Sequence, residues 1–242
     1  MGPLLEVTLD GVALGASYGL LAVGFTLAFG VLRRVDLAYG ASVMVGLYLA
    51  LWLHQRFALG GIAVALACLA GTVCSAAYVE RMCFRPHMRK AAGAAVAASF
   101  AIWMQLQEGA MLLLPLHSYA FPSPLDGWTS SAAALRPPQL VALAGAAGLA
   151  GGLWLLIHRA RFGLAVRAIV HDPETAACMG VNVPRVSTQV FLLVAATGSA
   201  AGYLIVLIHG QITPMFAMWA TLKGLAAAML GGLGSLAGAV VG

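Results

Sequence analysis

Long apolar stretches separated by short polar intervals dominate the pattern of hydrophobic and polar positions along the chain. An α-helix rises about 1.5 Å per residue, so about 20 apolar residues cross the hydrocarbon core of a bilayer. The second stretch is short, so we expect it to be broken, tilted or partly re-entrant. The pattern predicts an all-α, polytopic membrane protein with about seven segments: Leu9–Leu32, Leu37–Leu53, Gly61–Val79, Ala91–Leu114, Leu140–Ile157, Ser187–Ile208 and Met215–Gly242.

Composition supports a membrane protein. The 242 residues are 62% hydrophobic and only 9% charged, whereas soluble domains carry about 25% charged residues. The net charge of +5 could suggest a nucleic-acid partner, but its distribution argues otherwise. With the N-terminus outside, ten of the 13 basic residues fall on the inner side and only Arg56 and Arg136 outside. This asymmetry indicates membrane orientation.

The polar interval Arg159–Val186 contains clear signals for the start and end of a helix, and the charge distribution predicts that it lies in the cytoplasm. Asp172 is a favourable N-cap, Pro173 suits the first helical position, and Glu174 interacts well with the positive end of the helix dipole. Gly180 can end the helix in a left-handed conformation. We therefore expect a helix of about two turns inside this loop.

This helix should run from about Pro173 to Met179, and Pro184 should prevent it from resuming. Ala176, Ala177 and Met179 would form a small apolar surface on it. A helix this short is marginal in water, so we expect it to pack on this chain or on a partner. The loop is thus either a simple connection or a docking element.

Polar side chains in apolar segments are candidate functional residues because they are costly in lipid. Asp36 could line a path, or act as an N-cap or ion-pair partner of Arg34. Gln107 and Glu108 could line a path, bond to neighbouring helices or reach the interface. Lys223 could extend toward the lipid headgroups or face a cavity. We find no catalytic constellation, metal-ligand spacing or phosphate-binding loop in the sequence.

The run Leu230–Ala239 is very rich in glycine. Tight helix packing would explain the glycines. A broken helix that lines a substrate path is the alternative, because glycines let backbone groups face a cavity.

Five runs carry a resemblance to a known family: Gly19–Leu27, Val35–Gly40, Ser99–Glu108, Ala176–Asn182 and Leu222–Ala239. They resemble the inner-membrane permease subunits of bacterial ABC importers for branched-chain amino acids, a group that includes urea and amide permeases. The resemblance spans nearly the whole chain, and the last run is the most specific. This chain departs from the family where Asp36 and Glu108 replace asparagine and Tyr39 replaces histidine.

The resemblance implies a single transmembrane permease domain over residues 1–242 with a cytoplasmic coupling loop at about 159–186. The coupling residues it implies are Asp172, Pro173, Glu174, Ala176, Ala177, Met179, Gly180 and Asn182. The translocation path would include Asp36, Tyr39, Gly40, Gln107, Glu108, Gly231, Gly232 and Gly234.

The implied function is the permease subunit of a binding-protein-dependent ABC importer, multi-pass in the bacterial inner membrane. It would translocate a branched-chain amino acid or a related small polar solute. This chain would be no enzyme and need no cofactor, because two partner ATP-binding subunits would bind and hydrolyse ATP. A homologous permease subunit and a periplasmic substrate-binding protein would complete the complex, in the lipid bilayer and without nucleic acid. A stand-alone secondary transporter or channel is the alternative, since broken helices suit that class equally well.

Overall fold

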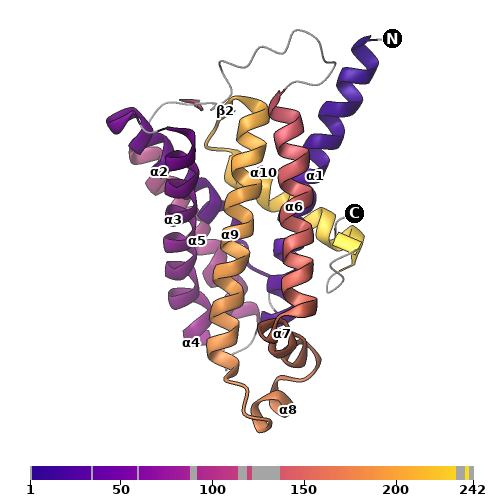
Figure 1. The fold of residues 1–242 in the computed structure, drawn as a ribbon. Coiled ribbons are helices and arrows are strands. Elements are labelled where there is room, and N and C mark those ends of the chain that lie inside the picture. The colour runs from indigo at the N-terminus through magenta and orange to yellow at the C-terminus, as the bar shows by residue number, and fades with distance from the viewer. Residues whose placement is uncertain are drawn as a thin grey trace.

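The computed structural model describes residues 2–33, 35–58, 60–87, 92–113, 119–121, 137–232 and 238–239. Most of these residues are helical, and Figure 1 shows the long helices gathered in a bundle. In chain order the elements are α1 (Gly2–Leu32), α2 (Tyr39–Phe57), α3 (Gly61–Val79), the π-helical turn η1 (Glu80–Phe84), α4 (Arg85–His87), α5 (Ala92–Leu113), β1 (Tyr119–Ala120), α6 (Pro137–Arg159), α7 (Arg161–His171), α8 (Pro173–Cys178), α9 (Val183–His209), β2 (Gln211–Ile212) and α10 (Phe216–Gly231).

The long helices α1 and α9 form the centre of the bundle. Helix α1 packs against α9, α10 and α6, and α9 also packs against α3 and α2. Leu20, Leu21, Met44, Leu47 and Ile205 are almost fully buried where these helices meet. The interior is therefore a close-packed set of large aliphatic side chains.

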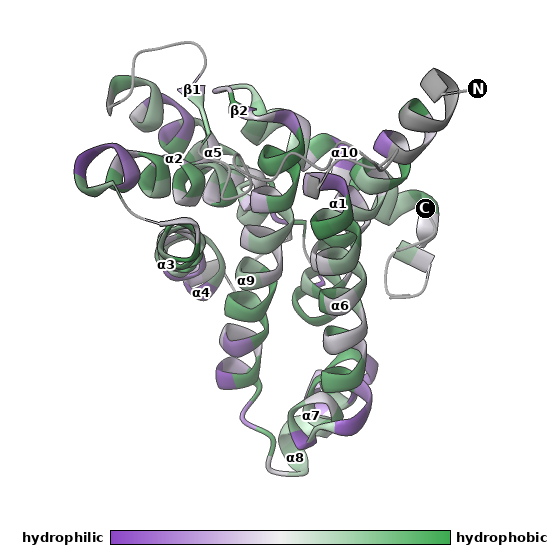
Figure 2. Ribbon diagram, turned by 45° about the horizontal axis from the view of Figure 1, so that its top comes forward, coloured by the Kyte–Doolittle hydropathy of each residue, from purple (hydrophilic) through white to green (hydrophobic). Residues whose placement is uncertain are grey.

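Apolar side chains also cover the outside of the molecule. Ile62 and Leu66 on α3, and Trp154 and Leu155 on α6, are all more than half exposed. In Figure 2 the long helices carry mostly apolar colours, and hydrophilic residues gather around α7 and at helix ends. An apolar outer surface of this kind is suited to lipid rather than water.

Four helical stretches of the described residues are long and apolar enough to cross a membrane: Asp10–Leu32, Gly61–Phe84, Pro138–Arg159 and Val183–His209. Phe216–Gly231 is a shorter apolar helix. The expected seven segments are not confirmed as a count. Helices α2 and α5 match the second and fourth predicted stretches, but their polar residues lower their mean hydropathy. Helix α2 is an unbroken helix of 19 residues.

The last predicted stretch does not form one helix. Helix α10 ends at Gly231, and Gly232 follows with a φ of 91°. The carbonyl group of Gly238 occupies the position that a Cβ on Gly231 would need, so the chain folds back on the end of α10. The prediction of a purely helical chain also missed one antiparallel strand pair, in which Tyr119 of β1 lies opposite Ile212 of β2.

The two ends of the bundle differ in character. The N-terminus and β2 lie at one end in Figure 1, and α7 and α8 project from the other. Sequence analysis predicts that the first of these ends faces the outside and that the loop with α7 and α8 lies in the cytoplasm. The structure places these two regions at opposite ends of the bundle.

Candidate functional site

The interval between α6 and α9 contains two helices, of which sequence analysis predicted only the second. The missed helix is α7, and it buries Gly163, Val166 and Ile169 on one face. Their three-residue spacing is the signal that could have revealed an amphipathic helix. Helix α7 packs against α6, α8, α9 and α1, and it therefore connects α8 to the bundle.

The predicted N-cap of α8 is confirmed. Asp172 has an extended backbone, and its Oδ1 accepts a hydrogen bond from the Glu174 N–H at 3.0 Å. The Thr175 hydroxyl donates to Oδ2 of the same carboxylate. These two hydrogen bonds, the Thr175 one first, hold the pKa of Asp172 below its usual range, and Arg33 adds a smaller effect in the same direction.

The predicted C-terminal glycine of α8 is also confirmed. Gly180 has a φ of 88°, which an L side chain rarely adopts. The Val181 N–H donates to the Ala176 carbonyl at 3.1 Å, and the Gly180 N–H donates to the Ala177 carbonyl at 3.0 Å. This pair of bonds forms a Schellman motif. The helix ends at Cys178, one residue earlier than expected.

The predicted apolar surface of Ala176, Ala177 and Met179 is divided between two environments. Ala176 is 3% exposed and belongs to the hydrophobic core of this chain, whereas Ala177 is exposed and Met179 is 82% exposed. Sequence analysis left open whether this helix packs on its own chain or on a partner, and the side that carries Ala176 packs on its own chain. The exposed surface available for docking consists of Ala177, Cys178 and Met179, which we call the α8 tip.

Asn182 and Pro184 begin a helix. The Asn182 Oδ1 accepts a hydrogen bond from the Arg185 N–H at 3.2 Å, so Asn182 is the N-cap of α9. Helix α8 does not resume after Gly180, as expected, but Pro184 lies in the first turn of the new helix α9. A proline in the first turn removes an N–H group that has no helical partner there, and its ring fits the helical backbone.

Arg33 is a connection that sequence analysis missed. Its guanidinium donates to the carbonyl oxygens of Val170 and His171, each at 3.2 Å, across more than 130 residues of sequence. These carbonyls end α7, immediately before Asp172. Arg33 itself has a left-handed backbone with a φ of 50° at the end of α1. It therefore joins the central helix α1 to the junction between α7 and α8, a contact that we call the Arg33 clamp.

Two of the predicted path residues pack between helices. Asp36 is buried, and its Oδ1 accepts from the Ala38 N–H at 2.9 Å in the turn before α2. Tyr39 is also buried; its hydroxyl donates to the Val194 carbonyl of α9 at 3.3 Å, and its ring meets Phe25 of α1 edge-on at 4.7 Å. In this conformation Tyr39 holds α1, α2 and α9 together.

Gly40 lets α2 approach α10 closely. A Cβ at this position would collide with the Thr221 hydroxyl and come within 2.5 Å of the Ala217 carbonyl, both on α10. Only glycine fits this approach without movement of one helix.

Residues 107 and 108 on α5 differ from each other in environment. The Gln107 Oε1 is buried and has no hydrogen-bond partner among the described residues, which is a costly arrangement in a static interior. Glu108 is exposed. The two residues therefore do not face one common cavity.

The glycine-rich run begins in the last turn of α10. Gly231 is the last residue of this helix, and Gly232 follows with a φ of 91°. Gly234 lies outside the described residues. Of the predicted path residues, the structure brings together Asp36, Tyr39 and Gly40 around the start of α2.

Apolar helices long enough to cross a bilayer, and a capped helical loop at one end, define a multi-pass helical membrane protein. Residues 7–242 match the model of a family described as "Branched-chain amino acid transport system / permease component". The chain belongs to this family of permease subunits of ABC importers.

Two relatives match almost the whole of this chain, and a third matches part of it. The chain is 29% identical to the Escherichia coli K12 high-affinity branched-chain amino acid transport system permease protein LivH, over 98% of this chain and 82% of that protein. It is 27% identical to the corresponding Pseudomonas aeruginosa protein, BraD, with the same coverage. A shorter match of 86 residues, 36% of this chain and 24% of the relative, links it to the Rhizobium meliloti fructose import permease protein FrcC at 29% identity. No solved structure matched the chain significantly.

Proposed function

We propose that this permease subunit moves a branched-chain amino acid, or a chemically related small solute, across the bacterial inner membrane. The support is the likeness to LivH and BraD over almost the whole chain. The likeness to FrcC covers only about a third of the chain, so it does not support a sugar as the substrate. Membership of the permease family favours this role over the stand-alone transporter or channel.

The proposed complex contains a second, homologous permease subunit, two ATP-binding subunits and a periplasmic substrate-binding protein. The ATP-binding subunits bind and hydrolyse the nucleotide, and this chain holds no cofactor. The periplasmic protein delivers substrate to the end of the bundle that carries β1 and β2.

The observation that carries the coupling role is the α8 tip. Helix α8 is fixed at both ends by its caps, buries Ala176 on its own chain and leaves Ala177 and Met179 exposed. We propose that the tip inserts into a groove of an ATP-binding subunit. Small Ala177 permits close approach, and Met179 can fill an irregular pocket. Of the other predicted coupling residues, Asp172, Pro173 and Glu174 shape the first turn of α8, and Gly180 ends the helix that presents the tip.

A movement of the α8 tip would be transmitted to the bundle through two sets of contacts. Helix α8 packs on α7 and α9, and the Arg33 clamp ties the α7–α8 junction to α1. Movement of α1 against α2 and α10 would change the contacts of Tyr39 and Gly40. In this proposal the start of α2, the Gln107–Glu108 region and the end of α10 line or control the path.

The experiment compares Ala177→Arg with Ala177→Ser in the complete complex. Arginine adds bulk and a charge that a buried contact would have to desolvate, which costs several kcal/mol, whereas serine stays small. We expect Ala177→Arg to keep its membrane level but lose ATP-driven leucine uptake, and Ala177→Ser to retain both. Normal uptake by Ala177→Arg would remove the docking role from the α8 tip.

A further inference from the structure

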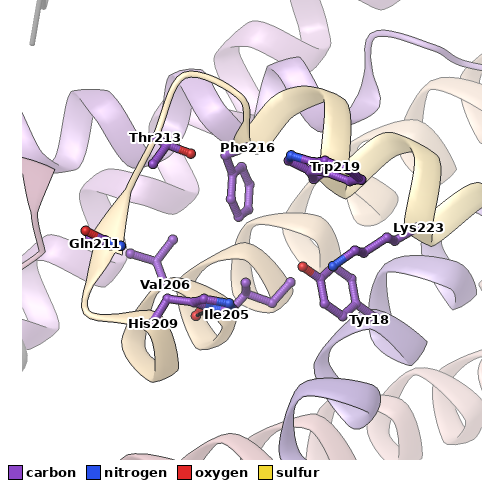
Figure 3. Close-up of a pocket in the computed structure, with 9 residues that line it drawn as sticks. All are labelled: Tyr18, Ile205, Val206, His209, Gln211, Thr213, Phe216, Trp219 and Lys223. Atoms are coloured by element: carbon purple, nitrogen blue, oxygen red, sulfur yellow. Dashed lines mark hydrogen bonds between the residues drawn. The ribbon is translucent and has the colours of Figure 1, made fainter. Parts of the chain in front are cut away.

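A pocket opens between α1, α9 and α10 near β2, at the end of the bundle opposite α8. Its volume is about 260 Å³. Ile205 and Val206 of α9 and Phe216 of α10 provide apolar walls, and Figure 3 shows the side chains around the space. Sequence analysis left open whether Lys223 faces lipid or a cavity; the structure places it at this pocket.

The Lys223 ammonium is held by two aromatic rings from different helices. Its Nζ lies 4.8 Å from the centre of the Tyr18 ring on α1 and 5.6 Å from the centre of the Trp219 ring on α10. Figure 3 shows the amino end directed toward Tyr18. Ring faces attract a cation but do not neutralise it. Within the part of the chain that the structure describes, no carboxylate is paired with Lys223, so its charge remains available to an anionic group.

The same pocket offers hydrogen-bond acceptors. The His209 Nδ1 lies 2.9 Å from the Ile205 carbonyl oxygen, which can only accept, so Nδ1 carries the proton. In the neutral ring, Nε2 is therefore an acceptor. Gln211 adds an amide oxygen, and Thr213 adds a hydroxyl group.

Cation, acceptors and aliphatic walls together fit the three parts of an aliphatic α-amino acid. We propose that this pocket receives the substrate from outside, with Lys223 binding the carboxylate. His209 and Gln211 accept hydrogen bonds from the substrate ammonium, and Ile205, Val206 and Phe216 contact its side chain. This inference rests on the proposed function, because it requires that the imported solute carry a carboxylate.

The test measures binding of radiolabelled leucine to the assembled transporter in nanodiscs. The periplasmic protein is left out, so that any leucine bound is bound by the membrane complex. Unlabelled leucinamide, which lacks the carboxylate, serves as the matched competitor. The wild-type complex should prefer leucine to leucinamide. Lys223→Gln should weaken leucine binding about tenfold, as expected for the loss of one charge-assisted contact, and should abolish the preference. Lys223→Arg should retain it.

Co-purification of the ATP-binding subunits shows that each variant is assembled. An assembled Lys223→Gln complex that still prefers leucine would overturn the proposal, as would a wild-type complex that binds leucine and leucinamide equally. Leucine uptake by the wild type separates this inference from the proposed function. Uptake with no effect of Lys223→Gln refutes the pocket alone, whereas the absence of any amino-acid uptake by the complete wild-type system refutes both.

Discussion

Removal of the Arg33 clamp should uncouple ATP hydrolysis from transport. Arg33→Ala deletes two hydrogen bonds to the carbonyls that end α7. Hydrogen bonds from charged donors contribute roughly 1.5–3 kcal/mol each when well shielded. Because Arg33 is exposed, we expect the pair to contribute about 1–2 kcal/mol in total.

A change of this size alters the ratio between molecules in which α1 is bound to the α7–α8 junction and molecules in which it is not by a factor of about 5 to 30. We therefore expect the number of solute molecules imported per ATP hydrolysed to fall by up to that factor. Basal hydrolysis should persist, because the nucleotide sites lie on other subunits in the proposed complex. The assay is parallel measurement of uptake and phosphate release in proteoliposomes.

Arg33→Gly is the matched control for the backbone. It also deletes the guanidinium, but glycine accepts the left-handed φ of 50° that costs other residues roughly 1 kcal/mol. We expect Arg33→Gly to denature at a higher temperature than Arg33→Ala and to be equally uncoupled. Wild-type uptake per ATP in Arg33→Ala would refute the clamp, and wild-type coupling in Arg33→Gly alone would assign the effect to the backbone.

Three further predictions address topology, path and cap. In a chain without other reactive cysteines, an impermeant thiol reagent applied to intact cells should miss a cysteine placed at position 87 and label one placed at position 130; the reverse pattern would contradict the orientation. Glu108→Gln should reduce uptake more than it reduces protein level, and an equal fall in both would make Glu108 structural. Because hydrogen bonds lower the pKa of Asp172, its cap should stabilise α8 above the ordinary aspartate pKa of about 3.9 and be lost as pH falls through the lowered value. Hydrogen exchange at the Glu174 amide should show this loss, and Asp172→Ala should lack the protection at every pH.

Capping residues at both ends made α8 predictable from sequence. Asp172 and Gly180 act within three residues of the groups they bond, so residue type and spacing were sufficient. Residues 61–79 likewise form a helix with the predicted bounds, because Gly60 precedes a continuous apolar run.

Contacts between distant segments were not predictable in the same way. The Arg33 clamp joins residues more than 130 positions apart, and nothing in the sequence near Arg33 marks its partners. The side of α8 that packs on this chain was not predictable, because a two-turn helix has several small residues and only its packing on α7 decides which one is buried. Lys223 was ambiguous for the same reason, since its ring partner Tyr18 lies on another helix.

The most direct test of the account is whether the α8 tip touches an ATP-binding subunit. A photo-crosslinking amino acid at Met179, which is 82% exposed, would be activated in membranes that contain the complete complex. A second position, Trp154 on the apolar outer face of α6, serves as the control. We predict that position 179 crosslinks to a subunit identified by mass spectrometry as an ATP-binding protein, with a yield that changes when nucleotide is added, and that position 154 does not. A complex that hydrolyses ATP and imports solute without any such crosslink from position 179 would contradict the account.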